Sequence, residues 1–133
     1  MRASLDPRLE GLTERVIGAA FAVSRELGHG FLEAVYRNAL TEEFSAAGIP
    51  CEMEKQFAVW YRGKVVGRYI ADLVVGSLIV VELKAISALS ESHMVQAFNY
   101  LRVSGLPAAL LINFGTPKVQ LRRILNERAL SSV

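Results

Sequence analysis

The sequence lacks the features of disulfide-bonded and membrane-spanning proteins. Cys51 is the only cysteine, so an intrachain disulfide is excluded and a thiolate zinc site would lack its ligands. The longest apolar run, residues 16–23, is eight residues long, whereas a bilayer-spanning helix needs about 20. Acidic residues precede this run and no cleavage-like site follows it, unlike in a signal peptide. We therefore expect a cytoplasmic protein without membrane contact, in which any metal site uses oxygen ligands.

An excess of one charge is also missing. The 15 Lys and Arg residues face 13 Asp and Glu residues, and the net charge of +2 neither demands nor excludes a polyanionic partner. Basic residues near the C-terminus could follow phosphates or form a solvated strip: Lys118, Arg122, Arg123 and Arg128. With 133 residues, 52% of them hydrophobic, the chain is long enough for one domain, which we expect to span residues 1–133.

Three segments have the apolar periodicity of amphipathic helices. Apolar residues recur at three- and four-residue steps over residues 9–27, 31–44 and 87–104. Glycine follows the first segment, and Gly48 and Pro50 follow the second, where they favour a helix end. The first third of the chain is therefore predicted to be helical.

The remaining segments are typical of strands. Residues 51–61, 65–75 and 78–85 follow one another with short turns between them, which predicts a meander. Residues 108–113 form a short apolar strand, and residues 119–125 predict another strand or a turn of helix. Because a helical crossover lets the strand after it run parallel to a neighbour, we expect a mixed central sheet flanked by helices, of the α/β or α+β class.

Three charged residues interrupt these apolar strands. Asp72 lies in the second strand, and Glu82 and Lys84 share one face of the third. An unpaired ionised group in a low-dielectric site costs several kcal/mol, so these charges need a partner, a metal or solvent. If residues 76–77 form a two-residue turn, Asp72 pairs with Val81, and a slip of one residue would bring it opposite Glu82. The pattern predicts that two carboxylates and an ammonium group converge.

Two interpretations of this cluster are open. In the first, Asp72 and Glu82 bind a divalent cation, and their hard oxygens suit Mg²⁺ better than zinc. Lys84 could then deprotonate or orient a water molecule and offset the charge that grows on a phosphate. In the second, Lys84 forms a structural ion pair with Glu82 or Asp72 at the edge of the sheet.

Five ordered blocks resemble the GxxExxY proteins, a small branch of the PD-(D/E)xK nuclease-like superfamily. The blocks are residues 30–36 (GFLEAVY), 71–72 (AD), 81–84 (VELK), 93–101 (HMVQAFNYL) and 111–115 (LINFG). The resemblance covers roughly residues 9–125 and implies a restriction-endonuclease-like core of helix, three-stranded meander, helix and strand. This order agrees with the one predicted from periodicity alone. Alanine replaces the proline of the superfamily name, at a position that supplies no ligand.

The resemblance also implies roles for individual residues. Asp72 and Glu82 correspond to metal ligands and Lys84 to the catalytic lysine. Glu33 corresponds to an acidic residue, on the helix before the sheet, that completes or tunes the metal site. Gln96 matches a position on the later helix that supports the site in related enzymes.

Several neighbouring residues allow a second explanation. Glu33 could instead pair with Arg37, one helical turn further on. His93 and Tyr100 share the side of the later helix that carries the supporting position, but ordinary packing and exposure account for both as well. Whether Tyr36 has a functional or a packing role is likewise open.

These observations predict a nuclease that uses Mg²⁺ or Mn²⁺ to hydrolyse phosphodiester bonds of DNA or RNA. The alternative is a non-catalytic nucleic-acid-binding or regulatory module that retains the nuclease fold, and a third option is a structural protein in which Glu82 and Lys84 simply pair. A homodimer fits the nuclease interpretation, because cutting both strands of a duplex calls for two sites related by a two-fold axis. Trp60 and Tyr61 could stack on bases, although such a pair on a strand is more often part of the core.

Overall fold

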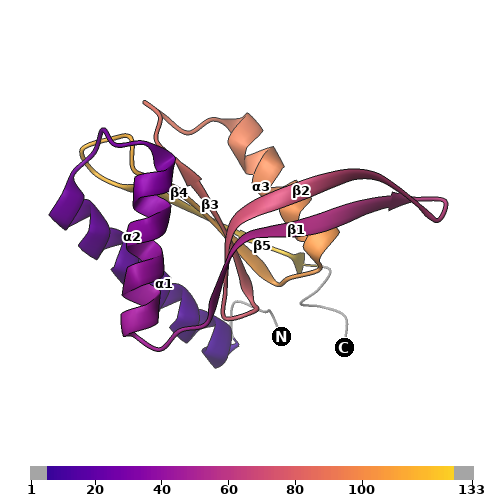
Figure 1. Ribbon diagram of the computed structural model, residues 1–133, viewed down its shortest axis with the longest axis horizontal. Coiled ribbons are helices and arrows are strands. Elements are labelled where there is room, and N and C mark those ends of the chain that lie inside the picture. The colour runs from indigo at the N-terminus through magenta and orange to yellow at the C-terminus, as the bar shows by residue number, and fades with distance from the viewer. Residues whose placement is uncertain (1–5, 128–133) are drawn as a thin grey trace.

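The structure, a computed structural model, describes residues 6–127 and follows the predicted order of helices and strands (Figure 1). Arg128 of the basic cluster and both ends of the predicted domain lie outside the described residues. No helix within residues 6–127 is long and apolar enough to cross a bilayer. The elements are α1 (Pro7–Leu27), α2 (Glu33–Ala46), β1 (Cys51–Tyr61), β2 (Lys64–Val75), β3 (Ile79–Lys84), α3 (Glu91–Ser104), β4 (Ala108–Asn113) and β5 (Gln120–Leu125).

The strands form one mixed sheet in the order β1-β2-β3-β4-β5. β3 and β4 run parallel and are joined through α3, whereas the other neighbours are antiparallel. This arrangement confirms the predicted α+β class and the mixed sheet. Residues 119–125, for which a strand and a turn of helix were both open, contain the edge strand β5.

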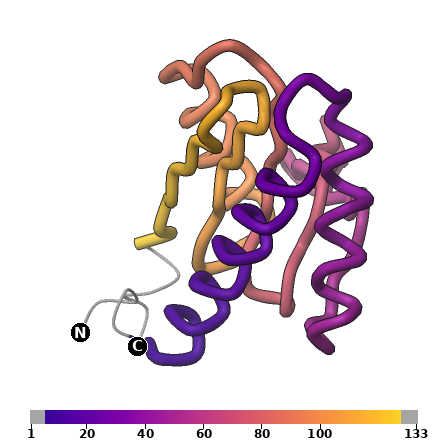
Figure 2. The backbone as a smooth tube through the Cα atoms, turned by 90° about the vertical axis from the view of Figure 1, so that its left-hand side faces the viewer, coloured from indigo at the N-terminus to yellow at the C-terminus, as the bar shows by residue number. Residues whose placement is uncertain are grey.

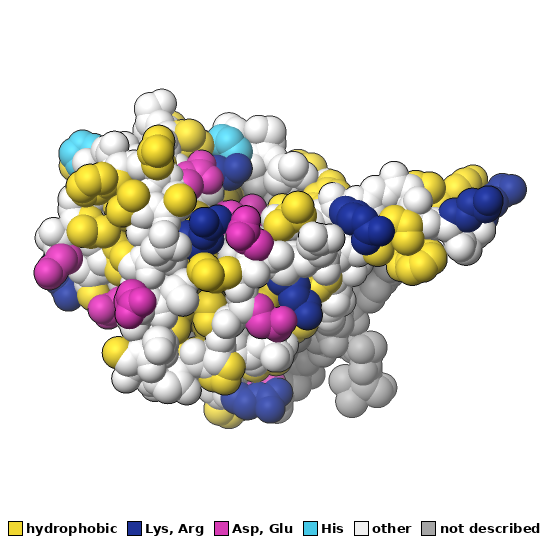
Figure 3. Space-filling model, viewed as in Figure 1, with side chains coloured by type: hydrophobic (Ala, Val, Ile, Leu, Met, Phe, Trp, Pro, Cys, Tyr) yellow, Lys and Arg dark blue, Asp and Glu magenta, His cyan; other side chains and the backbone are white. Residues whose placement is uncertain are grey.

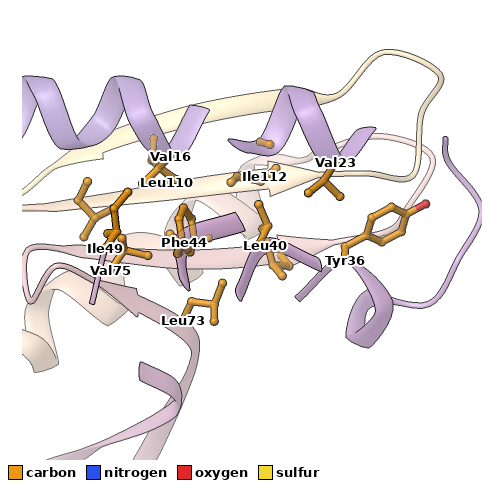
Figure 4. Packing of buried hydrophobic residues seen from close by; sticks show 14 of the residues in the cluster. Val16, Val23, Tyr36, Leu40, Phe44, Ile49, Leu73, Val75, Leu110 and Ile112 are labelled. Atoms are coloured by element: carbon orange, nitrogen blue, oxygen red, sulfur yellow. The ribbon is translucent and has the colours of Figure 1, made fainter. Parts of the chain in front are cut away.

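Helices cover both faces of the sheet. α1 and α2 lie side by side on one face and α3 lies on the other (Figures 1 and 2). Their apolar sides bury a large cluster against the first face, in which Val16, Leu40 and Phe44 meet Leu73 and Leu110 (Figure 4). A smaller cluster lies under α3. The central strands β3 and β4 are consequently buried on both faces, which explains their nearly continuous apolar sequence.

Side chains cap the helices at the positions where the apolar pattern begins. The Asp6 carboxylate accepts a hydrogen bond from the Arg8 N–H at 2.9 Å, and Pro7 occupies the first turn of α1. At α3, His93 Nδ1 accepts a hydrogen bond from the Ser90 N–H at 3.0 Å and completes a capping box. The His93 ring therefore has a structural role at the start of α3.

Tyr36 anchors the connection between α1 and α2. Its side chain is completely buried, and its hydroxyl donates a hydrogen bond to the Gly28 carbonyl at 2.7 Å. The ring stacks on Phe114, which follows β4, with centroids 4.4 Å apart and an interplanar angle of 2°. The structure thus gives Tyr36 a packing role, as a link between the first helical connection and the end of the sheet.

Asn113 fixes the chain that leaves β3. It is completely buried, and its amide oxygen accepts hydrogen bonds from the Ile86 and Gly115 N–H groups, each at 3.0 Å. Its amide nitrogen donates to the Ile86 carbonyl and to Gln120, also at 3.0 Å. A side chain at Gly115 would overlap the main chain of Ile86, so glycine is required there. These contacts hold the segment directly after Lys84 against the end of β4.

We expect Asn113→Ala to lower the free energy of unfolding by about 3 kcal/mol, because it leaves several buried main-chain groups without partners. Gln120→Ala removes one of the four hydrogen bonds and should cost about 1 kcal/mol or less. Urea denaturation of both variants measures the difference. Equal losses would show that Asn113 does not act through the main chain of residues 86 and 115.

Candidate active site

The β1–β2 ribbon separates from β3 next to the predicted site. β2 pairs with β3 only from Leu73 to Val75, opposite Val81 to Ile79, whereas β2 pairs with β1 along most of its length. The connection to β3 is a three-residue loop, residues 76–78, and the predicted two-residue turn is wrong. Gly76, the first residue of this loop, has a φ of 59° and packs against α1, where a side chain would clash. The extra residue shifts the register so that Asp72 comes opposite Glu82.

Beyond the last β2–β3 residue pair, two acidic side chains accept the hydrogen bonds that main-chain carbonyls would accept in a continuous ladder. Glu82 Oε1 accepts a hydrogen bond from the Asp72 N–H at 3.1 Å. In return, Asp72 Oδ2 accepts one from the Leu83 N–H at 2.7 Å. Because opposite residues of an antiparallel pair point to the same face, both carboxylates lie on one side of the sheet. The convergence predicted for Asp72 and Glu82 is therefore present at the fork between β2 and β3.

Burial shifts the protonation of both groups. Glu82 is only 8% exposed, and this burial, followed by repulsion from Asp72, raises the pKa of Glu82 from 4.5 to about 8. Burial also raises the pKa of Asp72, although the hydrogen bond from Leu83 and the Lys84 ammonium oppose the shift. Two acids held in a poorly solvated place repel each other when both are ionised. A cation between them would relieve this repulsion.

The charge of Lys84 acts on both Asp72 and Glu82. It lowers the pKa of both Asp72 and Glu82. Among residues 6–127, however, Lys84 forms no ion pair with either carboxylate. The structural ion pair that the sequence left open is thus not formed, and the partly buried ammonium group remains available.

Two residues that sequence analysis did not assign to the site also act on Asp72. Arg37 on α2 lowers its pKa, and Glu54 on β1 raises it. Arg37 forms an ion pair with Glu54 at 3.7 Å. The pair of Glu33 with Arg37, which the sequence left open, does not form within residues 6–127. Glu54 has a φ of 53°, rare for a non-glycine residue within a strand. In the sequence it resembles any solvent-facing acid, and only the register of β1 with β2 places it opposite Asp72.

The structure places the other predicted residues less directly. Glu33 is exposed in the first turn of α2 and raises the pKa of Glu82, so its charge reaches the site. Tyr100 donates a hydrogen bond to the Ile70 carbonyl at 2.6 Å, and its pKa is raised by burial and by the charges of Glu82 and Asp72. Gln96 is exposed one turn earlier on α3 and makes no hydrogen bond with residues 6–127. Tyr100, rather than Gln96, is the α3 residue in contact with the site.

The donor set fits a hard divalent cation held by two carboxylates. One oxygen of Asp72 and one of Glu82 are fixed by main-chain N–H groups. Their second oxygens have no hydrogen bond within residues 6–127, yet neither is a buried unpartnered atom, so both reach solvent. Residues 6–127 contain no preformed group of three acidic, His or Cys ligands. Glu33 is therefore not gathered with Asp72 and Glu82 into one cluster, and water or substrate oxygens would complete the coordination.

Comparisons with known proteins relate the sequence to a family and the fold to a solved structure. The sequence model of the family described as the PD-(D/E)XK nuclease superfamily matches residues 10–124. The fold is similar to a solved structure described as "Crystal structure of SSO0001", with a TM-score of 0.54 and 20% sequence identity. The alignment covers 94% of this chain but 63% of that one, so this chain spans less than two thirds of that protein. No curated protein matches the sequence.

Without divalent ions, the free energy of unfolding should fall as the pH rises from about 5 to about 8. The folded chain retains a proton on Glu82 that the unfolded chain loses near pH 4.5, and the slope should approach about 1.4 kcal/mol per pH unit. Glu82→Gln should flatten this profile, whereas Glu42→Gln, on the exposed side of α2, should leave it unchanged. Urea denaturation in EDTA across this range tests the expectation. Parallel profiles for wild type and Glu82→Gln would contradict it.

Proposed function

This chain belongs to the PD-(D/E)XK nuclease superfamily, and from that premise we propose that it hydrolyses phosphodiester bonds of nucleic acid with the help of Mg²⁺ or Mn²⁺. The observation that carries the proposal is the pair of crossed hydrogen bonds between Asp72 and Glu82 and the opposing strands. They fix one oxygen of each acid and leave the other within reach of solvent. A further assignment to the GxxExxY branch rests on the sequence blocks and stays a prediction.

Asp72 and Glu82 would hold the cation, with Glu33 acting on the site through its charge. The bound cation would supply Lewis-acid stabilisation of the negative charge that develops on the phosphate. The two acids are held in position by main-chain N–H groups before any substrate arrives, which favours this role.

As an ammonium group, Lys84 would orient the attacking water and offset the charge that develops on the phosphate; only in its neutral amine form would it take a proton from that water. Its ammonium group lies near both acids without an ion pair within residues 6–127, so it can also face the phosphate. The hydrogen bond from the Phe114 N–H to the Lys84 carbonyl, at 2.8 Å, fixes the main chain at this residue. In-line attack would then break the bond to the leaving oxygen. Gln96, which reaches solvent near Tyr100, would contact the substrate rather than the cation.

The competing function is a nucleic-acid-binding or regulatory module without cleavage. The two interpretations share the fold and differ in whether the charged residues serve chemistry. An ion pair of Lys84 with Glu82 or Asp72 would have favoured the third option, a structural protein, and no such pair forms within residues 6–127. An ammonium group that can face a phosphate favours cleavage over binding alone. The proposal includes DNA or RNA as the substrate, a homodimer and a cytoplasmic location.

We expect the purified protein to cleave single- or double-stranded DNA or RNA only with Mg²⁺ or Mn²⁺. Asp72→Asn and Lys84→Ala should each reduce the rate by at least about 100-fold, since each removes charge stabilisation at the reacting phosphate. Glu42→Gln, on the exposed side of α2, is the matched control and should cleave at the wild-type rate. A gel assay over a panel of substrates measures these rates. Cleavage that survives both site substitutions would show that the activity belongs elsewhere.

Titration with Mn²⁺ should distinguish the two ligands, Asp72 and Glu82, from Glu33, which acts on the site through its charge. Asp72→Asn and Glu82→Gln should abolish binding, because each removes one of the two paired carboxylates. Glu33→Gln should weaken binding by roughly 10-fold, as expected for a charge outside the first coordination shell. Isothermal titration calorimetry without nucleic acid gives these affinities. Complete loss of binding in Glu33→Gln would make Glu33 a direct ligand instead.

A further inference from the structure

The β1–β2 ribbon extends beyond the fork as an arm, defined as residues 55–71 (Figure 1). This arm carries four basic residues and no acidic one, although the whole chain has a net charge of only +2. Lys55 pairs with Glu52, whereas Arg62, Lys64 and Arg68 have no ion pair within residues 6–127. On the face shown in Figure 3, Lys and Arg side chains appear on the arm and at its tip without any carboxylate. The arm is therefore a cationic projection from a body that is otherwise slightly acidic.

The arm also exposes aromatic surface. Trp60 is 66% exposed and Tyr61 is 59% exposed, near the tip of the ribbon. Arg62 lies over the Tyr61 ring, with its guanidinium carbon 5.3 Å from the ring centroid. A bulge between Val59 and Trp60 shifts the register with β2 and bends the end of the ribbon. Large exposed rings beside unpaired cations are typical of surfaces on which bases stack.

A groove connects the arm to the body of the protein. It has a volume of about 590 Å³ and lies between β1, β2 and α3, with Trp60, Tyr69, Asn99 and Arg102 in its lining. Tyr69 packs edge-to-face against Tyr100 at 4.9 Å. Tyr100 in turn bonds the carbonyl of Ile70, two residues from Asp72. Tyr69 and Tyr100 therefore link the lining of the groove to the strand that carries Asp72.

We propose that the arm and this groove bind a single-stranded segment of nucleic acid next to the phosphate that is cleaved. This inference rests on the proposed nuclease function and adds the class of substrate. Arg62, Lys64 and Arg68 would follow the phosphates, and Trp60 would stack on a base at the mouth of the groove. Residues 57–71 contain no Asn, Gln, Ser, Thr, Asp or Glu. Apart from Gln56, the side chains of the arm that can reach base edges are Arg and Lys, which also bind phosphates, and stacking combined with backbone contacts fits single strands without strong sequence preference.

Charge also favours this ligand over a second copy of the chain. A two-fold pairing of arms would bring two sets of unpaired cations together, and like charges at an interface oppose association. A polyanion instead releases its counterions when these cations neutralise its phosphates.

The only tryptophan of the chain lies on the arm, which gives a direct measurement. We expect an oligothymidine of about 20 nucleotides to quench the emission of Trp60 in EDTA, where cleavage is excluded. A duplex of the same length should bind at least roughly 10-fold more weakly. Unchanged emission, or equal binding of the duplex, would overturn the proposal.

Variants of the arm test the contacts, with anisotropy of a labelled oligothymidine as the readout. Arg62→Asn with Lys64→Gln should weaken binding and lower the salt slope by about 1.4, since each phosphate contact on a single strand contributes about 0.7. Trp60→Ala should weaken binding by roughly 5- to 100-fold, and Trp60→Phe should restore most of it. The control is Arg8→Gln with Arg25→Gln, two exposed residues of α1, which lies away from the arm (Figure 1), and this variant should bind as the wild type does. Wild-type affinity and salt slope in the arm variant would overturn the proposal.

Two further outcomes separate this inference from the nuclease proposal, and a third tests whether the arm is a contact between copies of the chain. If the wild type binds oligothymidine through the arm but cleaves nothing with any divalent ion, the arm stands and the nuclease proposal fails. If the protein cleaves but the arm variants bind normally, the arm proposal alone fails. If sedimentation shows that the arm variants convert a dimer into a monomer with unchanged oligothymidine affinity, the arm is a contact between copies and the proposal is overturned.

Discussion

The exchange of hydrogen bonds between two acidic side chains and the facing main chains is the constraint on which the rest of this structure depends. Where β2 and β3 separate, Asp72 and Glu82 supply the acceptors that the strands no longer give each other. Without them, buried N–H groups would be left unpaired at the centre of the sheet, which is costly. The same two groups thus maintain the fork and concentrate negative charge there. The fold uses one oxygen of each acid, and the proposed chemistry uses the other.

The surroundings of the fork are arranged from three sides. α2 brings Arg37 and Glu33, β3 brings Lys84, and each of these three shifts the pKa of at least one of the two acids. α3 brings Tyr100, whose own pKa the two acids raise. Charges of both signs act on the pair, and neither acid forms an ion pair within residues 6–127. Such partial compensation leaves room for a divalent cation, whereas a complete set of ion pairs would have closed the site.

Much of this could be predicted from the sequence, and the exceptions have a physical explanation. The order of helices and strands follows from apolar periodicity, and the unusual charges in the second and third strands marked Asp72, Glu82 and Lys84. The register depends on the loop conformation at residues 76–78, in which Gly76 packs against α1, and a local count of turn residues does not include that tertiary contact. Glu54 and Arg37 were missed because only strand pairing and helix docking bring them to Asp72.

The left-handed conformation of Glu54 opposes the addition of further strands at the outer edge of the sheet. β1 is an outer strand, and an outer strand with a regular row of free N–H and C=O groups invites other chains to join the sheet. The break at Glu54 interrupts that row where the ribbon meets the body, and places a carboxylate there. A substitution that restored a fully extended backbone at this residue would lengthen the unprotected edge and increase the tendency to aggregate.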